Sequence, residues 1–266
     1  MTLLKFSPLK DNAKLKWMGK NAYSFSLLSG WSCPNAHLCQ SRVVETEEGR
    51  RIKDGKNIEF RCFSASQELV FKNLYLQRKH NFELIKSVCQ SVSDMKILIT
   101  NSLPKDAKVV RLHIAGDHPN QRYFDAWLEV AIENPTIHFY GYTKSLRFWI
   151  NRLDKIPENL ILTASLGGNL DHLIQENSLR FCKVVYSEYE ARKLHLPIDT
   201  DDKLAMLPKN KNRDFAIVVH SPGPKGSKHA LAWKRQIDGK NKFHGYTSNK
   251  PSFGKYYKEN YNDVTI

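Results

Sequence analysis

The sequence predicts an α/β protein in which a parallel sheet curves into a partial (β/α)6 barrel within a single main domain. Strand-like and helix-like segments alternate along most of the 266 residues, a length that can bury a sizeable core. The later strands are apolar on both faces, and the helical segments between them supply the connections that parallel strands need. Six β/α units also fit an open doubly wound sheet. We favour the barrel because the turn after the first strand lacks the GxGxxG pattern of dinucleotide-binding sheets.

Six strands are predicted, and each is followed by helical sequence. The strands span residues 23–29, 109–115, 137–143, 159–165, 181–187 and 214–220. One or two helices follow the first strand within residues 66–92, and the later helices span 121–134, 144–153, 170–177, 188–194 and about 227–236. Residues 41–59 are polar, carry the turn signals EEGR and KDGK, and are interpreted as a surface excursion.

The chain divides into three parts by composition. Residues 1–22 form a basic N-terminal segment, residues 23–238 the β/α domain, and residues 239–266 an irregular tail rich in Gly, Ser, Asn and Tyr. There is no apolar run of about 18 residues and no signal-peptide pattern, so we expect a soluble, intracellular protein with no membrane partner. Five cysteines, an odd number, then predict reduced thiols instead of a disulfide framework.

The formal net charge is +14, with Lys and Arg concentrated near the N-terminus and between residues 203 and 258. Such an excess could attract nucleic acid, an acidic host partner or an anionic small molecule, because all three respond to the same field. It also fits a solvated basic surface. No helix-turn-helix spacing, zinc finger or RNA-binding aromatic signature accompanies the charge, so nucleic-acid binding is kept as an alternative.

Three cysteines lie where packing does not explain them. Cys33 and Cys39 occupy the loop WSCPNAHLCQ after the first strand, and Cys62 lies in FRCFSAS just before a predicted helix. The helix dipole and Arg61 could favour the thiolate of Cys62. Three thiolates could therefore meet after the end of the first strand and serve as metal ligands. Cys89 and Cys182 share apolar helix or strand faces and fit simple packing.

Three thiolates leave the identity of the metal open. Structural zinc usually takes four protein ligands, so a zinc site would need a fourth from His37 or His118. A [4Fe–4S] cluster held by three cysteines would instead leave one iron open for water, substrate or a cofactor. We expect the cluster, and we keep zinc as the alternative.

Further polar residues follow the predicted strands, at the end where β/α barrels keep their active sites. The candidates for binding a cofactor or substrate are Gly116, Asp117, His118, Lys144, Ser165, Glu188 and His220. Thr143, Ser165 and Ser187 also suit helix N-caps. Residues 220–227, HSPGPKGS, combine backbone amides, a lysine and a helix start that suit an anion, but they lack the P-loop pattern.

Several segments together resemble a bacteriophage family known by its gene-product number, eighty-eight. They are YSFSLLSGWSCPNAHLC, FRCFSASQE, VVRLHIAGDHPNQRYFDAWLEVA, IHFYGYTKSL, NLILTASLGG and KVVYSEYEA, within about residues 15–235. The resemblance implies a viral protein that acts in the cytoplasm of the infected bacterial host. Cys33, Cys39 and Cys62 match cysteines of the family motifs, whereas Cys89 and Cys182 do not.

A more distant likeness is to radical S-adenosylmethionine enzymes, which have six β/α units and three cysteines after the first strand. It implies a [4Fe–4S] cluster, with S-adenosylmethionine as a further cofactor and a radical reaction. This chain departs from that pattern in two places. The compact CxxxCxxC motif is absent, and Gly116-Asp117 stands where a Gly-Gly-Glu stretch is expected.

Overall fold

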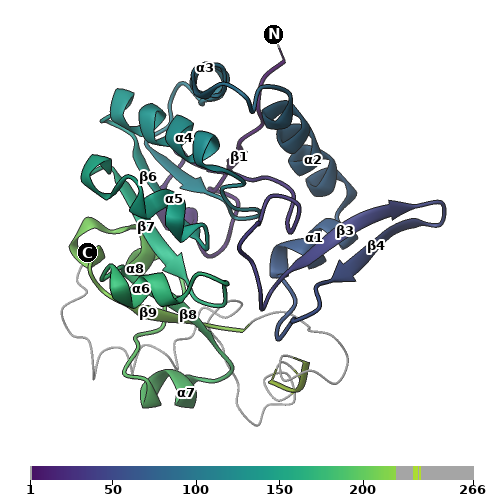
Figure 1. Ribbon diagram of the computed structural model, residues 1–266, viewed down its shortest axis with the longest axis vertical. Coiled ribbons are helices and arrows are strands. Elements are labelled where there is room, and N and C mark those ends of the chain that lie inside the picture. Colours follow the sequence, from purple (N-terminus) through teal and green to yellow (C-terminus); the bar gives the residue numbers. More distant parts are fainter. Residues whose placement is uncertain (1, 220–229, 233, 235–266) are drawn as a thin grey trace.

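The computed structural model describes residues 2–219, 230–232 and 234. Its main feature is a seven-stranded sheet with the strand order β1-β2-β5-β6-β7-β8-β9 (Figure 1). The strands are β1 (Ser7–Pro8), β2 (Ala22–Phe25), β5 (Val109–Leu112), β6 (His138–Thr143), β7 (Leu160–Ser165), β8 (Phe181–Val185) and β9 (Phe215–Val218). Only the first pair, β1 with β2, is antiparallel within this sheet, and every later pair is parallel.

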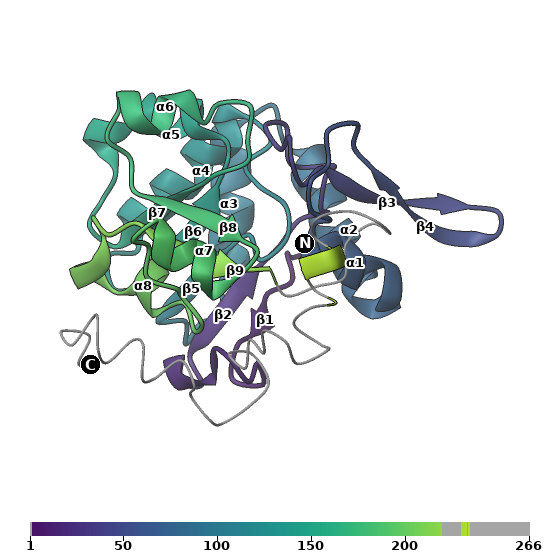
Figure 2. The ribbon, with the colours of Figure 1, turned by 90° about the horizontal axis from the view of Figure 1, so that it is seen from below.

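The parallel strands lie side by side in sequence order, so each connection crosses to the next neighbour. Right-handed crossovers then place successive connecting helices on the same face. Figure 2 shows helices α3 to α6 together on one side of the sheet. The helices are α1 (Phe63–Val70), α2 (Lys72–Ser87), α3 (Val92–Ser102), α4 (Gln121–Glu133), α5 (Leu146–Ile150), α6 (His172–Glu176), α7 (Glu188–Lys193) and α8 (Lys203–Met206), with single 3-10 turns at Lys16–Met18, Leu153–Lys155 and Pro208–Asn210.

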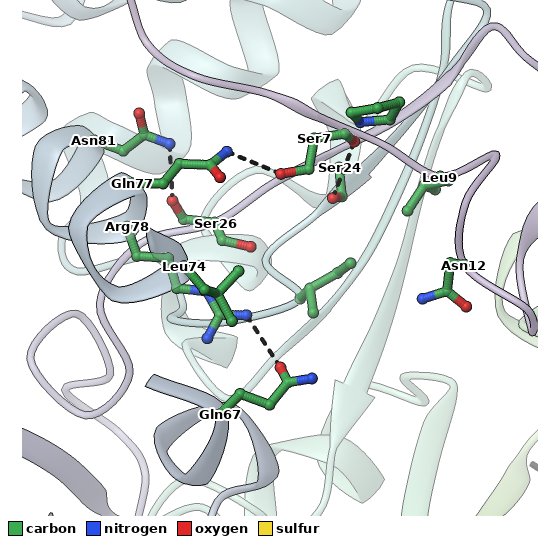
Figure 3. A pocket seen from close by; sticks show the side chains of 12 residues that line it. Ser7, Leu9, Asn12, Ser24, Ser26, Gln67, Leu74, Gln77, Arg78 and Asn81 are labelled. Atoms are coloured by element: carbon green, nitrogen blue, oxygen red, sulfur yellow. Dashed lines mark hydrogen bonds between the residues drawn. The ribbon is translucent and has the colours of Figure 1, made fainter. Parts of the chain in front are cut away.

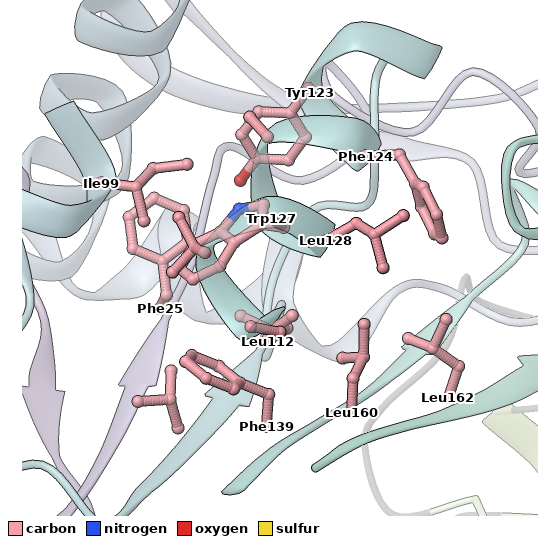
Figure 4. Close-up of a cluster of buried hydrophobic side chains, with 14 of the residues drawn as sticks. Phe25, Ile99, Leu112, Tyr123, Phe124, Trp127, Leu128, Phe139, Leu160 and Leu162 are labelled. Atoms are coloured by element: carbon pink, nitrogen blue, oxygen red, sulfur yellow. The ribbon is translucent and has the colours of Figure 1, made fainter. Parts of the chain in front are cut away.

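The main core lies between this helical layer and the sheet. Helix α4 begins with Asn120, whose side chain accepts a hydrogen bond from the backbone N–H of Tyr123, and it turns its apolar stripe to the strands. Trp127 is the largest fully buried side chain and packs against Phe25 and Phe139 (Figure 4). Burying one such aromatic or aliphatic side chain stabilises the fold by about 1.5–3 kcal/mol. This layer therefore holds the strand ends in fixed positions.

The opposite face of the sheet is partly ionic. Asp202, which begins α8, is fully buried and lies within 3.0 Å of both the Arg111 guanidinium and the Lys14 ammonium. Arg111 holds the pKa of Asp202 below its usual value, although burial opposes this effect. The neighbouring Asp199 has the reverse shift, because burial raises its pKa to about 7. Helix α8 thus packs on the sheet through charged as well as apolar contacts.

A two-stranded hairpin projects from the body of the molecule (Figures 1 and 2). It consists of β3 (Ser41–Thr46) and β4 (Gly49–Asp54), which pair from Ser41↔Asp54 to Thr46↔Gly49. One face of the hairpin buries Val43 against Tyr75 of α2. The hairpin connects the loop after β2 to helix α1, and so it separates the two cysteine-bearing segments in sequence.

The structure confirms the α/β class and the six predicted parallel strands, with shorter bounds. Closure into a barrel is not shown, because the described strands form an open sheet with β1 and β9 at its edges. The predicted helices at 66–92, 121–134, 144–153, 170–177 and 188–194 correspond to α1–α2, α4, α5, α6 and α7. The hairpin, α3 and α8 were not predicted. The tail at 239–266 and most of the predicted helix at 227–236 lie outside the described residues.

No helix within the described ranges has both the length and the apolar character needed to cross a bilayer.

Candidate metal centre

The loop that carries Cys33 and Cys39 lies against the carboxyl end of the sheet. Two glycines permit this close approach. Gly30 has φ +73°, and a Cβ there would lie 2.4 Å from the carbonyl oxygen of Ser41. Gly116 has φ +84°, and a Cβ there would lie 2.4 Å from Oγ of Ser32. Only glycine combines this backbone conformation with so little space, so the predicted site residue Gly116 sets the contact between the loop and β5.

The far half of the loop is anchored to the segment after β7. The backbone N–H groups of His37 and Leu38 donate to the carbonyl of Gly167, and the N–H of Asn169 donates to the carbonyl of Asn35. Ala36 forms a bridge with Gly168. The cysteine loop therefore spans the sheet edge from β2 to β7, across the ends of β5 and β6.

Cys62 joins the loop cysteines from a separate segment. It is the N-cap residue of α1, and the backbone N–H groups of Ser64 and Ala65 act to lower the pKa of its thiol. Burial, together with a smaller effect of Cys39, outweighs them and raises that pKa to about 11. Its position just before a helix start is the one predicted from the sequence.

The three thiols lie close enough for their charges to interact. Burial and then the Asp117 carboxylate raise the pKa of Cys33, and Cys62 and Cys39 add to this effect. The pKa of Cys39 is also raised by burial, while the Lys144 ammonium acts against the rise. Uncharged thiols are therefore favoured in the metal-free protein. A bound cation would replace the protons and stabilise the thiolates.

Asp117, predicted from the sequence, is buried at the centre of this edge. Its Oδ1 accepts hydrogen bonds from the Thr143 hydroxyl at 2.6 Å and from the backbone N–H of His118 at 2.7 Å. Its Oδ2 accepts one from the backbone N–H of Lys144 at 2.8 Å. Burial nonetheless raises the pKa of Asp117. The carboxyl group ties the ends of β5 and β6 together beneath the cysteine loop.

Lys144 and Ser165, two more predicted residues, meet at the next strand end. The Lys144 ammonium donates to the carbonyl of Ser165 at 2.7 Å, to the Ser165 hydroxyl at 2.8 Å and to the carbonyl of Leu166 at 2.8 Å. Its Nζ also lies 3.7 Å from the position a Cβ on Gly167 would take. This cation is thus held beside the cysteine loop by the end of β7.

His118 forms a buried group with His113, a residue that the sequence analysis missed. The imidazole centroids of the two lie 4.6 Å apart at 82°, and His118 also packs against Phe124 of α4. Burial lowers the pKa of both, to about 3 for His113. His113 has φ +56°, which is uncommon for a residue other than glycine. The pattern of two histidines and an aspartate within six residues at a strand end was the available signal.

A buried ion pair connects helix α1 to the start of the cysteine loop. Glu68 of α1 accepts hydrogen bonds from the Ser29 backbone N–H and hydroxyl, at 3.1 and 2.8 Å. The Arg78 guanidinium of α2 donates to the same Glu68 oxygen at 3.0 Å and to the carbonyl of Ser64 at 3.0 Å. These contacts fix Cys62 relative to the segment that leads to Cys33.

A small polar cavity of about 170 Å³ lies on the other side of α1, between β1–β2 and α2. Figure 3 shows its lining, which includes Ser24, Ser26, Gln67, Gln77 and Asn81. Ligand pockets usually enclose about 300–1,000 Å³, so this cavity suits only a small polar molecule.

The remaining predicted residues have different surroundings. Glu188 begins α7 after β8, where Ser187 caps the helix by accepting from the backbone N–H of Glu190. Cys182 is buried with Tyr140 and Phe215, in agreement with a packing role. His220 and the loop at 220–227 lie outside the described residues.

The cysteine sulfurs do not form a compact single-ion geometry. Within the described part of the chain, the group whose ligand atoms all lie within 4.8 Å of one another is His113, Asp117 and His118. Thiolates that share one zinc, with Zn–S bonds of about 2.3 Å, would lie closer together than about 4.6 Å. The metal-free protein therefore has no ready-made zinc site at its cysteines.

With this geometry described, comparison with known proteins places the chain. A family model described as Gene product 88 matches residues 3–236. The chain belongs to the Gene product 88 family. It is similar to the Gene 88 protein of Mycobacterium phage L5, with 25% identity over 124 residues, which are 43% of this chain and 44% of the phage L5 protein.

Membership of the Gene product 88 family confirms the resemblance on which a phage origin was predicted. The chain aligns with less than half the length of its phage L5 relative. No solved structure matches the chain. The comparisons give no support to a likeness to radical S-adenosylmethionine enzymes.

Proposed function

We propose that this Gene product 88 protein is an iron–sulfur protein of the infected bacterial cytoplasm, with a [4Fe–4S] cluster bound by Cys33, Cys39 and Cys62. The proposal is supported by the position of three thiols, from two separate segments, at the carboxyl end of a parallel sheet. Two facts support it: Cys39 and Cys62 both raise the pKa of Cys33, as Cys39 does that of Cys62, and none of the three belongs to an apolar core cluster.

A cluster suits these thiols better than a single zinc ion. Each ligand of a cubane cluster binds a different iron, so three thiolates can be spaced more widely than around one ion. His37, one candidate for a fourth zinc ligand, is exposed, and its Nδ1 lies 3.4 Å from the Asn57 side-chain amide. His118, the other candidate, belongs to a separate buried group with His113 and Asp117. Three cysteines would leave one iron with an open coordination position.

The polar groups at the same edge could hold a molecule that binds the open iron. Lys144 offers a positive charge beside Cys39, and Asp117 a carboxyl group beside Cys33. S-adenosylmethionine is one candidate for that molecule, and its reductive cleavage would require an external electron donor. The cluster itself would supply the electron, while the charge of Lys144 would act on the bound molecule through space.

The experiment is metal analysis of protein purified without oxygen. We expect a brown protein with about four irons and an equal amount of acid-labile sulfide per chain. Cys33→Ala, Cys39→Ala and Cys62→Ala should each lose the iron, whereas the control variants Cys89→Ala and Cys182→Ala should keep it. Stoichiometric zinc without sulfide after anaerobic reconstitution would show that the site is a zinc site.

The projecting hairpin favours a second, compatible function, which is contact with nucleic acid. Its outer face places Arg42 opposite Lys53 and carries Arg51 two residues along. The Arg42 guanidinium lies 4.6 Å from the ring centroid of Trp31, and this Trp is 45% exposed. Cations beside an exposed aromatic ring suit a phosphate backbone and an unstacked base. Trp31 lies two residues before Cys33, so a bound strand would approach the metal centre.

Fluorescence anisotropy with a labelled single-stranded oligonucleotide tests this contact. Lys53→Glu should weaken binding and reduce its salt dependence, and Trp31→Ala should weaken binding with little change in salt dependence. Lys155→Glu, which makes the same charge change at an exposed residue of another element, serves as the control. Equal losses in Lys53→Glu and Lys155→Glu would mean that only net charge matters and that the hairpin is not the contact surface.

A further inference from the structure

A second group of potential ligands lies beneath the cysteine loop, in the interior of the protein. His113, Asp117 and His118 are 5%, 5% and 2% exposed. One ligand atom from each lies within 4.8 Å of the other two. All three follow strand β5, and the strained φ of +56° at His113 turns the chain back at this point.

The histidines leave two nitrogen atoms unexplained. Nδ1 of His113 and Nδ1 of His118 are both buried, and neither has a hydrogen-bond partner among the residues that the structure describes. A buried polar atom without a partner destabilises the fold, so such atoms are rare and usually face an ion or water. Two of them in one small group point to a shared ligand.

The surrounding contacts leave these nitrogens free and hold the rings in place. Nε2 of His113 lies 3.0 Å from the Tyr123 hydroxyl, a hydrogen bond that fixes the ring and leaves Nδ1 as its open nitrogen. Histidines that bind metals usually have their second ring nitrogen oriented in this way. Within the described part of the chain, Oδ2 of Asp117 accepts one hydrogen bond, from the Lys144 backbone, so one of its lone pairs remains available.

Ring packing alone does not account for the arrangement. His118 packs edge-to-face with His113 and with Phe124. These contacts pack the rings together, but they do not supply a hydrogen-bond partner to the lone pair of Nδ1, which lies in the plane of the imidazole ring. A bound water or a bound cation would satisfy that lone pair.

We propose that His113, Asp117 and His118 bind one divalent transition-metal ion, through Nδ1 of each histidine and the carboxylate. This ion is separate from the cysteine-bound metal, and the inference does not depend on the proposed function. Two imidazoles and a carboxylate suit zinc, cobalt or ferrous iron. Magnesium and calcium prefer sites built from oxygen ligands. Because all three ligands lie within six residues after β5, the ion holds this buried segment in its bent conformation.

Cobalt titration of a Cys33→Ser/Cys39→Ser/Cys62→Ser variant tests the site without competing thiolates. We expect one equivalent of Co²⁺ to bind, with weak ligand-field absorption bands and no sulfur-to-cobalt charge-transfer band. A large excess of Mg²⁺ should not displace it. If the triple variant does not fold, the same titration is done on wild-type protein. Co²⁺ bound by thiolates is recognised there by its charge-transfer band, and Co²⁺ at the histidine site by the absence of that band.

Two single substitutions decide the ligands. His118→Phe keeps an aromatic ring, and His113→Asn keeps a residue type that tolerates positive φ. Each should weaken Co²⁺ binding by more than about 100-fold, because losing an outer partner of a ligand alone costs about 10- to 100-fold. His172→Ala, at an exposed histidine of α6, should bind Co²⁺ as the parent does. The proposal would be overturned if the parent did not bind Co²⁺. It would also be overturned if both variants bound Co²⁺ as tightly as the parent while their circular dichroism stayed unchanged.

Discussion

Removing Arg78 should show how strongly the fold around the candidate metal centre depends on the buried ion pair behind it. Arg78 and Glu68 are 3% and 0% exposed, and their contacts join α1, α2 and Ser29 at the start of the cysteine loop. Arg78→Met keeps much of the side-chain volume but leaves the Glu68 carboxyl buried without its cation. The other hydrogen-bond donors to Glu68, the Ser29 N–H and hydroxyl, remain.

The expected loss follows from burial. Removing one partner of a buried ion pair costs about 3–5 kcal/mol, because the other charge stays out of water. For a domain of this size, each kcal/mol corresponds to about 2–4 °C, so the melting temperature should fall by about 6–20 °C. The double variant Glu68→Met/Arg78→Met removes both charges and should be more stable than Arg78→Met alone.

The assay is urea or thermal unfolding of metal-free protein, so that metal binding does not contribute to stability. Arg51→Met is the matched control, because Arg51 pairs with Glu48 on the hairpin surface, where the two side chains are 62% and 73% exposed. Exposed pairs contribute about 0–1 kcal/mol. The control should therefore unfold almost as the wild type does.

The pH dependence of the free energy of unfolding gives an independent test. Burial raises the pKa of Glu68, and Arg78 opposes that rise, so Arg78→Met should raise the pKa further. The folded variant then retains a proton that the unfolded chain has released, and its stability must fall as pH rises above the unfolded pKa of about 4.3. A loss below about 1 kcal/mol in Arg78→Met, or a loss that does not grow with pH, would refute this reasoning.

Three further predictions concern single side chains. Gly116→Ala should lower stability and the iron content more than Gly19→Ala, which has nearly the same φ but no atom within 4 Å of the new Cβ; unfolding and iron assays compare them. Asp199 has a pKa raised to about 7, so stability should fall by a few kcal/mol as pH rises from about 4 to 7, at about 1.4 kcal/mol per pKa unit. Asp199→Asn should flatten that slope in denaturant melts, and an unchanged slope would contradict the assignment. Lys144→Met should raise the pKa of Cys39 and slow its alkylation by iodoacetamide at neutral pH in metal-free protein, whereas an unchanged rate would show that the ammonium does not act on this thiol.

The parallel strands could be predicted because their signal is local. Each strand has the apolar run that a buried strand requires, as in Leu160–Ser165 and Phe181–Val185. A turn or helix signal in the sequence marks where each run ends. The hairpin was missed because its strands are mostly polar and charged, so they lack the apolar alternation that predicts a strand. Some of the charged residues pack through the apolar part of their side chains, as Arg50 does over the Tyr75 ring. Helix α8 is four residues long and is held by long-range contacts of Asp202, which no local pattern reveals.

Some residues of the candidate site could likewise be predicted from local sequence, and others could not. Asp117, Lys144 and Ser165 were found because strand ends of a parallel sheet share one edge. His113 was missed because it was assigned to the preceding strand, whereas its positive φ ends that strand at Leu112. Glu68 reads as an ordinary helical surface residue in sequence. Only the fold brings it to Ser29 and Arg78, 39 and 10 residues away along the chain.

Mössbauer spectroscopy of protein purified without oxygen from cells grown on isotopically enriched iron tests the cluster most directly. The account predicts that about four irons per chain give the spectrum of a single [4Fe–4S] centre, and that Cys62→Ala loses that spectrum while Cys89→Ala retains it. A spectrum of isolated mononuclear iron, or an iron-free protein with one zinc bound at Cys33, Cys39 and Cys62, would contradict it.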